Sequence, residues 1–502
     1  MTKFRIEHIM KNKFNQAFEY HQNGQLTQAR DLYEQILYDE PQNHEVLDLL
    51  GILYTQVGQY DKALEYLQKA IDLKPLPFYI ENLAKMYFKK EDFQNAVELY
   101  EILIKNDPNN YENTFNLAMA YKNNGQYGKA KGTYYKAIEL NPNSTESYFN
   151  LAYLCFNDND AKGAIECYKK VLKINPDDWE TMYFLSLAYM QDKNYKDGLK
   201  CFEQRLCKQS AIVSQEKTYP NLMKQKPIWT GKEDLSDKTL YTYYEAGFGD
   251  VIMLYRFMPE LVSKCKKVIF KPQEELKPLF EDNSYGAEIM GMFKNESDMD
   301  FDYHLPFLSL PLVLGKSGED MFIHHNDGYI KPNPDKVKFY KENYFNNDKF
   351  KIGIKWQGNT YYETGRVINT DAFAPLFDIP NVQVYSAQTF EGSEAFEKLS
   401  SKYNIIDISK TFKDFSYTAA AVENLDLVIC NDTSLAHIAG AMNKPCVILL
   451  PYNYNWRWHT DLSYCDWYKS VTLALTGRYE NWNTLMERVT EYCMKTFNLS
   501  AK

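Results

Sequence analysis

The sequence predicts a protein of the α + α/β class, in which an α-helical repeat array is followed by parallel β-sheets covered by helices. The first observation is a period of 33 or 34 residues in the first half, visible in the spacing of its prolines. The second is a change near residue 214, after which short apolar runs alternate with helix-length segments. The third is the length of 502 residues, which is enough for about three domains.

The period indicates two antiparallel helices per repeat. Proline ends the second helix because it cannot donate the next backbone hydrogen bond, and it recurs at Pro41, Pro75, Pro108, Pro142 and Pro176. Small residues precede each proline by 12 positions, where two helices approach closely, at Ala29, Ala63, Ala96, Ala130 and Ala164, with Gly198 next in register. An aromatic register follows at Tyr33, Tyr100, Tyr134, Tyr168 and Phe202, with Leu67 in the second repeat. The pattern resembles six tetratricopeptide repeats, which we expect within residues 1–212.

Three asparagines share one position of repeats three to five: Asn82, Asn116 and Asn150. This position lies on the first helix of each repeat, which lines the concave groove of such an array. An amide side chain both donates to and accepts from a peptide bond, so a row of amides can hold an extended polypeptide. The row resembles the asparagine ladder of the O-GlcNAc transferase superhelix and predicts acceptor binding. A purely stabilising role within each repeat is the alternative, and the sequence leaves both open.

The second half predicts two α/β lobes behind a linker at 213–238. The apolar runs that predict strands are 239–247, 267–270, 351–356, 382–388, 405–409, 425–430 and 446–451. The charged segment 331–349 is expected to connect an amino-terminal lobe (239–345) to a carboxy-terminal lobe (346–502). Ligands bind such sheets at the carboxyl ends of their strands, so we expect a site in the cleft between the lobes.

Two strand-to-helix turns carry the candidate site residues. Gly247 and Gly249 permit a tight turn after the first strand, and Asp250 follows at the helix start, where it is either a helix cap or a catalytic acid. The second turn, after the run 425–430, reads Asp432-Thr433-Ser434 with His437 one turn into the helix. Its backbone N–H groups and hydroxyls predict a pyrophosphate site, and an ordinary capped helix with a buried histidine is the alternative.

The ordered set of motifs resembles the heptosyltransferase-like glycosyltransferases, which have the two-lobed GT-B fold. The motifs are GFGDVIMLYRFMPEL (247–261), NDTSLAHIAGAMNKP (431–445), PIWTG (227–231), DYHLPFLSLPLVLG (302–315), IGIKWQGN (352–359), YNYNWRW (452–458) and DWYKS (466–470). The resemblance is greatest to a bacterial group in which such a domain follows tetratricopeptide repeats. It implies inverting transfer of a sugar from a nucleotide-sugar donor.

The resemblance also implies a role for each matching residue. Asp250 corresponds to the general base that takes a proton from the acceptor hydroxyl. The residues expected to bind the donor are Lys355, Trp356, Asn359, Arg366, Gln388, Asp432, Thr433, Ser434, His437, Trp456 and Arg457. Among these, Arg366 and Lys355 are candidates for neutralising the leaving diphosphate, as the chemistry of the transfer requires.

Composition excludes several other classes of function. With 57 basic and 67 acidic residues the net charge is −10, which disfavours nucleic acid or anionic membrane as a general partner. No apolar run approaches the length of a membrane-spanning helix. The nine cysteines are scattered without a C-x-x-C pair, which predicts reduced thiols and a cytoplasmic location. No cluster has metal-ligand spacing, so we expect neither a metal nor another cofactor.

Together these observations predict a cytoplasmic, metal-independent, inverting glycosyltransferase that acts on a protein held in the repeat groove. The resemblance suggests a surface or flagellar protein as the acceptor. One alternative keeps the chemistry but places the sugar on a lipopolysaccharide-type glycolipid. Another is a repeat scaffold whose glycosyltransferase domain is inactive, since a fold alone does not establish a function.

Overall fold

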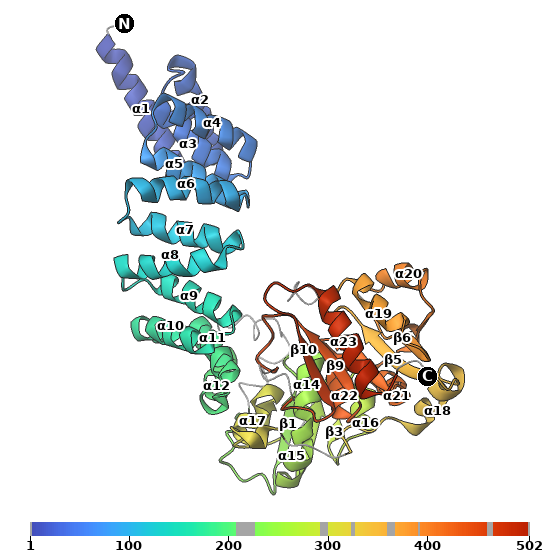
Figure 1. Cartoon of the computed structure of the whole chain (residues 1–502). Coiled ribbons are helices and arrows are strands. Elements are labelled where there is room, and N and C mark those ends of the chain that lie inside the picture. Colours follow the sequence, from blue (N-terminus) through green and yellow to red (C-terminus); the bar gives the residue numbers. More distant parts are fainter. Residues whose placement is uncertain are drawn as a thin grey trace. The chain divides into compact units, whose positions relative to one another are not determined.

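The computed structural model of the chain describes residues 3–206, 226–291, 300–322, 327–358, 367–389, 392–458 and 465–499 (Figure 1). The chain divides into two compact units, residues 1–177 and 178–502. Five helix pairs make up the first unit. A sixth pair and two α/β lobes make up the second.

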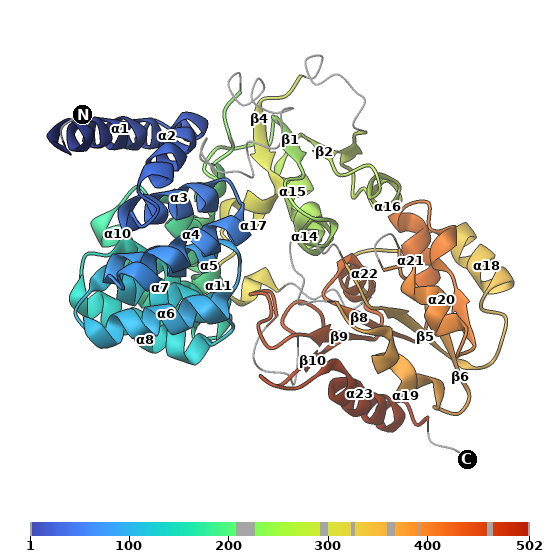
Figure 2. The ribbon, with the colours of Figure 1, turned by 90° about the horizontal axis from the view of Figure 1, so that it is seen from above.

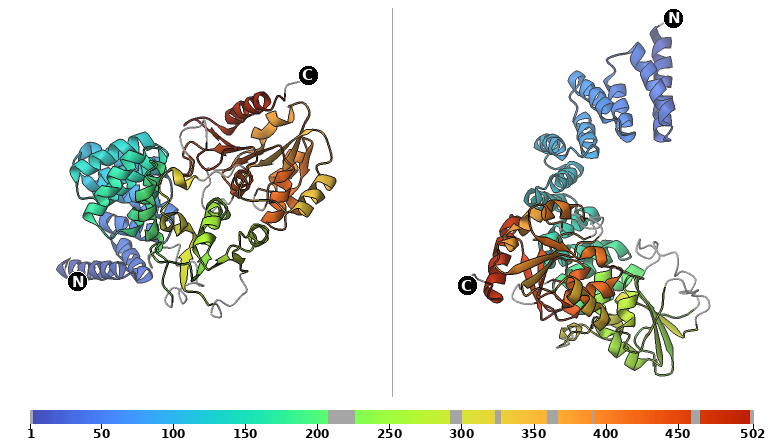
Figure 3. Two further views of the ribbon diagram at one scale, coloured as in Figure 1. Left: turned by 90° about the horizontal axis from the view of Figure 1, so that it is seen from below. Right: turned by 90° about the vertical axis from the view of Figure 1, so that its right-hand side faces the viewer.

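The first unit is a stack of antiparallel helix pairs, seen from two sides in Figures 1 and 3. Its helices are α1 (Lys3–Gln22), α2 (Leu26–Asp39), α3 (His44–Gln56), α4 (Tyr60–Leu73), α5 (Pro77–Lys89), α6 (Phe93–Asn106), α7 (Tyr111–Asn123), α8 (Tyr127–Leu140), α9 (Thr145–Asn157) and α10 (Ala161–Ile174). The second helix of each pair ends two residues before a proline of the predicted period. The first helices of several pairs begin at a side-chain cap, as where Asn110 accepts from the backbone N–H of Asn113. The tetratricopeptide-like solenoid is therefore confirmed.

The residues of the predicted registers form the interior of the array. The small residues at Ala29, Ala63, Ala96, Ala130 and Ala164 are fully buried. The large residues at Tyr33, Leu67, Tyr100, Tyr134 and Tyr168 are buried beside them. The helices of a pair also approach closely at Gly51 of α3, where an added methyl group would lie 2.4 Å from the side chain of Leu67.

The sixth helix pair belongs by its packing to the second unit. It comprises α11 (Trp179–Gln191) and α12 (Tyr195–Phe202), followed by the short 3-10 helix η1 (Glu203–Leu206). Tyr195 and Leu199 are buried in the same hydrophobic cluster as the lobe residues Leu305, Phe307 and Leu310. The repeats therefore continue to the end of α12, whereas the compact first unit ends at residue 177.

The amino-terminal lobe contains a parallel sheet with the strand order β3-β2-β1-β4. Its elements are β1 (Thr239–Tyr243), α14 (Phe248–Leu254), η2 (Tyr255–Phe257), α15 (Met258–Lys264), β2 (Lys267–Lys271), α16 (Lys277–Glu281), β3 (Glu288–Ile289), β4 (Tyr303–Pro306), η4 (Phe307–Ser309), α17 (Leu310–Val313) and η5 (Glu319–Met321). The central strand β1 leads directly to α14, which carries the glycine turn and Asp250.

The carboxy-terminal lobe contains a six-stranded parallel sheet with the order β10-β9-β8-β5-β6-β7. Its elements are α18 (Pro334–Asn343), β5 (Phe350–Lys355), η7 (Thr370–Phe373), α19 (Ala374–Phe377), β6 (Val382–Ser386), α20 (Ala395–Ser400), β7 (Ile405–Asp407), η8 (Ser409–Thr411), α21 (Phe415–Glu423), β8 (Leu427–Asn431), α22 (Ser434–Ala441), β9 (Cys446–Leu450), β10 (Val471–Leu475) and α23 (Trp482–Thr496).

Helices cover both faces of this sheet (Figure 2). Ile429 on β8 and its neighbours on one face pack against α19 and α23. Val428 and Cys430, on the other face, pack with α21 and α22. A strand buried on both faces reads as an unbroken apolar run, which is how most of these strands could be predicted.

All seven predicted apolar runs contain a strand, namely β1, β2 and β5 to β9. The strands β3, β4 and β10 were not predicted. β3 has two residues, β4 ends at Pro306, and β10 alternates buried with partly exposed positions at the edge of the sheet. The predicted connection 331–349 contains the helix α18.

Two further expectations concern the whole chain. Within the part of the chain that the structure describes, no helix has the length and apolar character needed to cross a membrane. The eight cysteines within the described ranges are free thiols, and five of them are buried.

Candidate active site between the two lobes

The centre of the candidate site is an ion pair that joins the two lobes. Asp250 stands in the first turn of α14, whose N-cap is Gly247, and Arg457 lies on the loop after β9. The Nε of Arg457 donates to Oδ1 of Asp250 at 2.8 Å, and its Nη2 donates to the same oxygen. The Asp250 side chain is 17% exposed. Its second oxygen, Oδ2, accepts no hydrogen bond from the described residues, so it is available to a ligand.

Arg457 is held by further contacts on its own loop. Its Nη1 donates to Oδ1 of Asn455 at 2.6 Å, and its guanidinium lies 5.0 Å from the ring centre of Trp456. Burial by itself would lower the pKa of Arg457, but the carboxylates of Asp250 and Asp432 raise it above its ordinary value. Arg457 is therefore a fixed positive charge between the carboxylates of the two lobes.

The turn between β8 and α22 lies at the carboxyl edge of the larger sheet. Asp432, 8% exposed, follows β8 directly, and Thr433 is the N-cap residue of α22. The Thr433 side chain does not cap the helix and instead donates to the carbonyl oxygen of Asn431 at 3.3 Å. The N-terminal end of α22, with Ser434 as its first residue, is therefore left without a side-chain cap, which suits an anionic ligand.

His437 lies inside the contact between α22 and α14. It is 3% exposed, and a hydrogen bond of 2.9 Å joins its Nδ1 to the hydroxyl of Tyr468. Its ring stacks on Trp458, with ring centres 5.3 Å apart. A methyl group on Gly249 would lie 2.6 Å from its Cδ2 atom. Burial lowers the pKa of His437 to about 4, so it is a neutral packing residue here, and its predicted contact with the donor stays a prediction.

The ends of β5 and β6 form a second group of predicted donor residues. The Gln388 amide accepts from the backbone N–H groups of Trp356 and Gln357 at 3.1 and 3.0 Å. It also donates to the carbonyl oxygen of Gln357 at 3.0 Å. Trp356 is 1% exposed, and its indole donates to the carbonyl oxygen of Gly392 at 3.0 Å. Gln388 and Trp356 therefore hold the strand ends together, and their predicted role in lining the donor pocket stays a prediction.

Lys355 ends β5 and lies at this same edge, paired in register with Cys430 of β8. Its Nζ donates to the hydroxyl of Thr389 at 3.2 Å. Burial lowers the pKa of Lys355 to about 8. The loop after β5 also approaches the β8–α22 turn, because a methyl group on Gly358 would lie 3.0 Å from the Thr433 side chain. Two other predicted residues, Asn359 and Arg366, lie outside the described residues.

The three ladder asparagines differ in what their amides contact. Asn82 donates to both carboxylate oxygens of Asp48, at 3.0 and 2.8 Å. Asn150 accepts from Nζ of Lys122 at 2.7 Å and donates to a backbone carbonyl oxygen of its own helix. The Asn116 side chain is half-buried and makes no hydrogen bond with another described residue. Two of the three amides therefore bond within the array, the third bonds no other described residue, and the predicted acceptor binding by this row stays a prediction.

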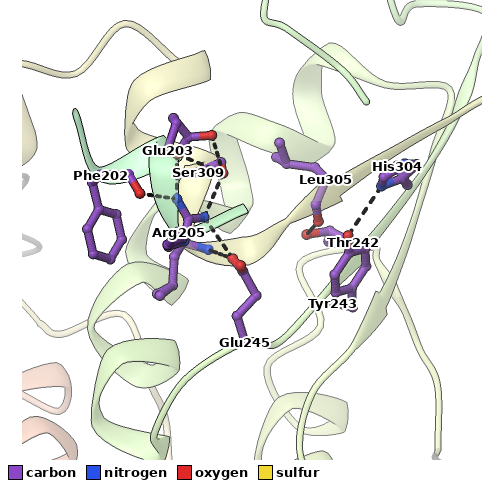
Figure 4. A network of polar contacts seen from close by, with 10 residues as sticks. Phe202, Glu203, Arg205, Thr242, Tyr243, Glu245, His304, Leu305 and Ser309 are labelled. Atoms are coloured by element: carbon purple, nitrogen blue, oxygen red, sulfur yellow. Dashed lines mark hydrogen bonds and ion pairs between the residues drawn. The ribbon is translucent and has the colours of Figure 1, made fainter. Parts of the chain in front are cut away.

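A charged cluster that the sequence did not predict anchors the loop before Asp250 (Figure 4). Arg205 of η1 is 1% exposed, and its Nη2 donates to Glu245 at 2.8 Å and to the Ser309 hydroxyl at 2.7 Å. Its Nη1 donates to Glu203 at 2.6 Å. Burial raises the pKa of Glu245, and the charge of Arg205 opposes that rise. Glu245 belongs to the turn after β1, but no local signal in the sequence marks Arg205 as its partner.

A second unpredicted cation, Arg256, lies in the contact between the lobes. It is 2% exposed, and its guanidinium lies 5.0 to 5.2 Å from the ring centres of Tyr329, Trp467 and Tyr468. Its Nε donates to the carbonyl oxygen of Met253 at 2.9 Å. Because Tyr468 also bonds His437, this aromatic cage links the packing of α14 and α22 to the loop before β10.

Comparison with known families agrees with both halves of this architecture. Tetratricopeptide repeat families match residues 49–75, 81–110, 99–132 and 145–178. Glycosyltransferase family 9 (heptosyltransferase) matches residues 411–461. The chain therefore combines tetratricopeptide repeats with a segment similar to glycosyltransferase family 9 (heptosyltransferase). The family 9 match contains Asp432, Thr433, His437 and Arg457, and Asp250 lies outside it.

Several curated proteins are similar to parts of this chain. Protein CTR9 homolog of Arabidopsis thaliana is 37% identical over 19% of this chain and 7% of its own length. Protein FlbA of Caulobacter vibrioides is 26% identical over 52% of this chain and 47% of its own length. The chain thus spans less than half the length of these two relatives.

Several solved structures are similar to part of this chain. A tetratricopeptide repeat protein from Parabacteroides merdae is 18% identical over 39% of this chain and 78% of that chain, with a TM-score of 0.36. MamA from Desulfovibrio magneticus is 20% identical over 34% of this chain and 96% of that chain, with a TM-score of 0.32.

Proposed function

We propose that this glycosyltransferase is inverting and metal-independent, and that it transfers a sugar from a nucleotide-sugar donor to a hydroxyl group of a protein acceptor. The observation that carries the proposal is the pairing of Asp250 with Arg457 across the two lobes, next to Asp432 at the start of α22. One lobe supplies a carboxylate with an open oxygen. The other supplies positive charge and free backbone N–H groups at the edge of its sheet.

In the proposed reaction Asp250 is the general base. Arg457 fixes Oδ1, and Oδ2 takes the proton of the acceptor hydroxyl. The acceptor oxygen then forms a bond to the anomeric carbon of the sugar. The bond from that carbon to the diphosphate oxygen breaks, and its electron pair leaves with the nucleoside diphosphate. Attack from the face opposite the leaving group inverts the configuration of the sugar.

The charge of the leaving diphosphate needs stabilisation. The N-terminal N–H groups of α22, beginning at Ser434, point in the direction that favours an anion. Lys355 and Arg457 supply positive charge from the neighbouring strand end and loop. These groups serve the purpose that a divalent cation serves in metal-dependent transferases. Metal independence predicts that transfer continues in the presence of a chelator.

The repeats support a protein as the acceptor, because arrays of this kind present extended surfaces to protein partners. The Asn116 amide is the ladder group left for such a ligand. The free thiols of the described residues are consistent with the proposed location in the cytoplasm.

The substitution Asp250→Asn tests the assignment of the base. We expect it to lower kcat by about 100-fold to 10,000-fold, because a general base contributes a factor of that order. Binding of the donor, measured as the shift in melting temperature with UDP-, GDP- and ADP-sugars, should remain. Asp414→Asn is the matched control, because Asp414 uses one oxygen to cap α21 and to accept from the Ser416 hydroxyl, and the amide oxygen of asparagine can do the same. Transfer at the wild-type rate by Asp250→Asn would refute the role of Asp250.

A further inference from the structure

The sixth helix pair differs from the two pairs before it in one aromatic contact. In repeats four and five a phenylalanine of the first helix meets a tyrosine of the second, as Phe149 meets Tyr168 with ring centres 5.6 Å apart. The equivalent pair in repeat four is Phe115 with Tyr134, at 6.0 Å. In repeat six the two residue types are exchanged, and Tyr183 of α11 stacks on Phe202 of α12 at 6.0 Å.

The exchange moves the hydroxyl group from the second helix of the pair to the first helix. Tyr134 is fully buried, and its hydroxyl finds no partner among the described residues. Tyr183 is only half-buried, and its hydroxyl also bonds no other described residue. Burial raises the pKa of Tyr183, while Arg457 lowers it and Asp250 raises it. The hydroxyl is therefore protonated near neutral pH, and it lies within electrostatic reach of the ion pair in the active site.

The other half of the exchange fixes α11 beside the lobe that carries Asp250. The Phe202 ring is a platform for the Arg205 guanidinium, which lies 4.6 Å from the ring centre. Arg205 in turn bonds Glu245, five residues before Asp250 (Figure 4). The side chains thus form a continuous series from Tyr183 through Phe202 and Arg205 to the turn after β1.

We infer that Tyr183 is an acceptor-contacting residue, whose hydroxyl donates a hydrogen bond to a backbone carbonyl oxygen of the acceptor polypeptide next to the hydroxyl that Asp250 deprotonates. This inference rests on the proposed function, because it requires a polypeptide acceptor at Asp250. The last repeat is then a wall of the active site, and not only a surface for docking. A peptide carbonyl suits a protonated phenol, which has a hydrogen to donate and no other described partner.

The test compares Tyr183→Phe with Tyr134→Phe. Each substitution removes one hydroxyl and keeps the ring, so the stacking on Phe202, the edge-to-face contact with Phe115 and the fold should be retained. The full-length wild-type protein is first assayed with labelled UDP-, GDP- and ADP-sugars and a pool of unstructured peptides rich in serine and threonine. The best pair of donor and peptide is then used for kinetics with both variants.

We expect Tyr183→Phe to raise KM for the peptide about tenfold, which corresponds to the loss of one hydrogen bond. Its KM for the donor, its hydrolysis of the donor without peptide and its melting temperature should stay at the wild-type values. Tyr134→Phe should match the wild type in every kinetic constant, because its hydroxyl is buried within repeat four.

Three results would overturn the inference. An unchanged KM for the peptide in Tyr183→Phe overturns the role of Tyr183. It leaves the proposed function intact, because the wild-type protein still transfers the sugar to the peptide. A fall in melting temperature together with equal losses for donor and peptide shows a structural role, and also overturns it. Absence of transfer to any peptide by the wild-type protein overturns the proposed protein acceptor, and the inference with it.

Discussion

The repeat array and the two lobes arrange their polar side chains over very different sequence distances. In the array, Asn82 bonds Asp48 across 34 residues and Lys122 bonds Asn150 across 28, so the partners belong to neighbouring repeats. In the second unit, Arg205 bonds Ser309 across 104 residues and Arg457 bonds Asp250 across 207. A substitution in the array should therefore act locally, whereas one at the lobe contact should change the reaction.

The tightest place in the lobe contact gives the largest expected effect. A methyl group in Gly249→Ala would lie 2.6 Å from the His437 ring, which Tyr468 and Trp458 prevent from moving away. We expect a loss of stability of about 1–3 kcal/mol, typical of an overpacked interior, and a fall in transfer rate of about 100-fold as Asp250 is displaced. Thermal unfolding and the transfer assay measure the two effects.

Gly247→Ala is the matched control for this substitution. A methyl group on Gly247 meets no atom within 4 Å, and its backbone angles of −62° and 161° suit any residue. We expect wild-type stability and at most a small change in rate. Equal losses in both glycine variants would show that the turn, and not the packing of α14 on α22, is what matters.

In the repeat array we expect a substitution at Asp48 to raise the stability of the fold, whereas Gly249→Ala lowers it. Burial raises the pKa of Asp48 to about 6, and the hydrogen bond from Asn82 opposes this rise only in part. A carboxyl group whose pKa is raised by folding adds stability at low pH, and that stability is lost as the pH rises through 6. Asp48→Asn should therefore stabilise the array at pH 7 by about 1–3 kcal/mol, and the gain should vanish near pH 4.

Hydrogen exchange of the α3 to α5 amides at pH 7, and unfolding by urea at both pH values, would measure this gain. Glu65→Gln is the control, because that exposed side chain only pairs with Lys69 along its helix. It should leave the unfolding midpoint unchanged. A destabilised Asp48→Asn variant at pH 7 would show that the charged carboxylate is needed in the array.

The smallest change in stability is expected at Asn116. It distinguishes the two possible roles of the asparagine row, which are acceptor binding and stabilisation of the repeats. Asn116→Ala removes an amide that bonds no other described residue, so we expect stability to change by less than about 0.5 kcal/mol. Asn82→Ala should cost about 1–3 kcal/mol, because it leaves the buried carboxylate of Asp48 without its donor. Affinity for the peptide acceptor should fall several-fold in Asn116→Ala. Comparable destabilisation by both variants, with acceptor affinity intact, would contradict a ligand role for Asn116.

The distance in sequence between contacting residues also determines how much of the structure the sequence predicts. The array could be predicted because each buried alanine and aromatic residue repeats its contacts at a fixed period. The strands β5 to β9 could be predicted because burial on both faces leaves an apolar run. The pairing of Asp250 with Arg457 could not, because nothing near either residue specifies a partner on the other lobe.

Amide and imidazole groups mark a further limit of prediction from sequence. Gln388 is suited to a donor ligand, yet the structure uses its amide for the backbone beside Trp356. His437 is likewise used for packing within the lobe contact. The chemistry of these groups is the same toward a ligand as toward the protein, so only the fold shows which contact is made. Tyr183 can be recognised in the sequence, because repeat six has tyrosine and phenylalanine in the opposite order from repeats four and five.

The division of the chain after residue 177 has a consequence for recombination. A crossover at the end of the repeats, near residue 212, would separate Arg205 from Glu245 and Tyr195 from the core that it shares with the lobes. A crossover after α10 would leave both intact. Exchange of α1 to α10 between related genes could therefore bring a new partner to an unaltered catalytic unit, and chimaeric enzymes with new acceptors should be built at that junction.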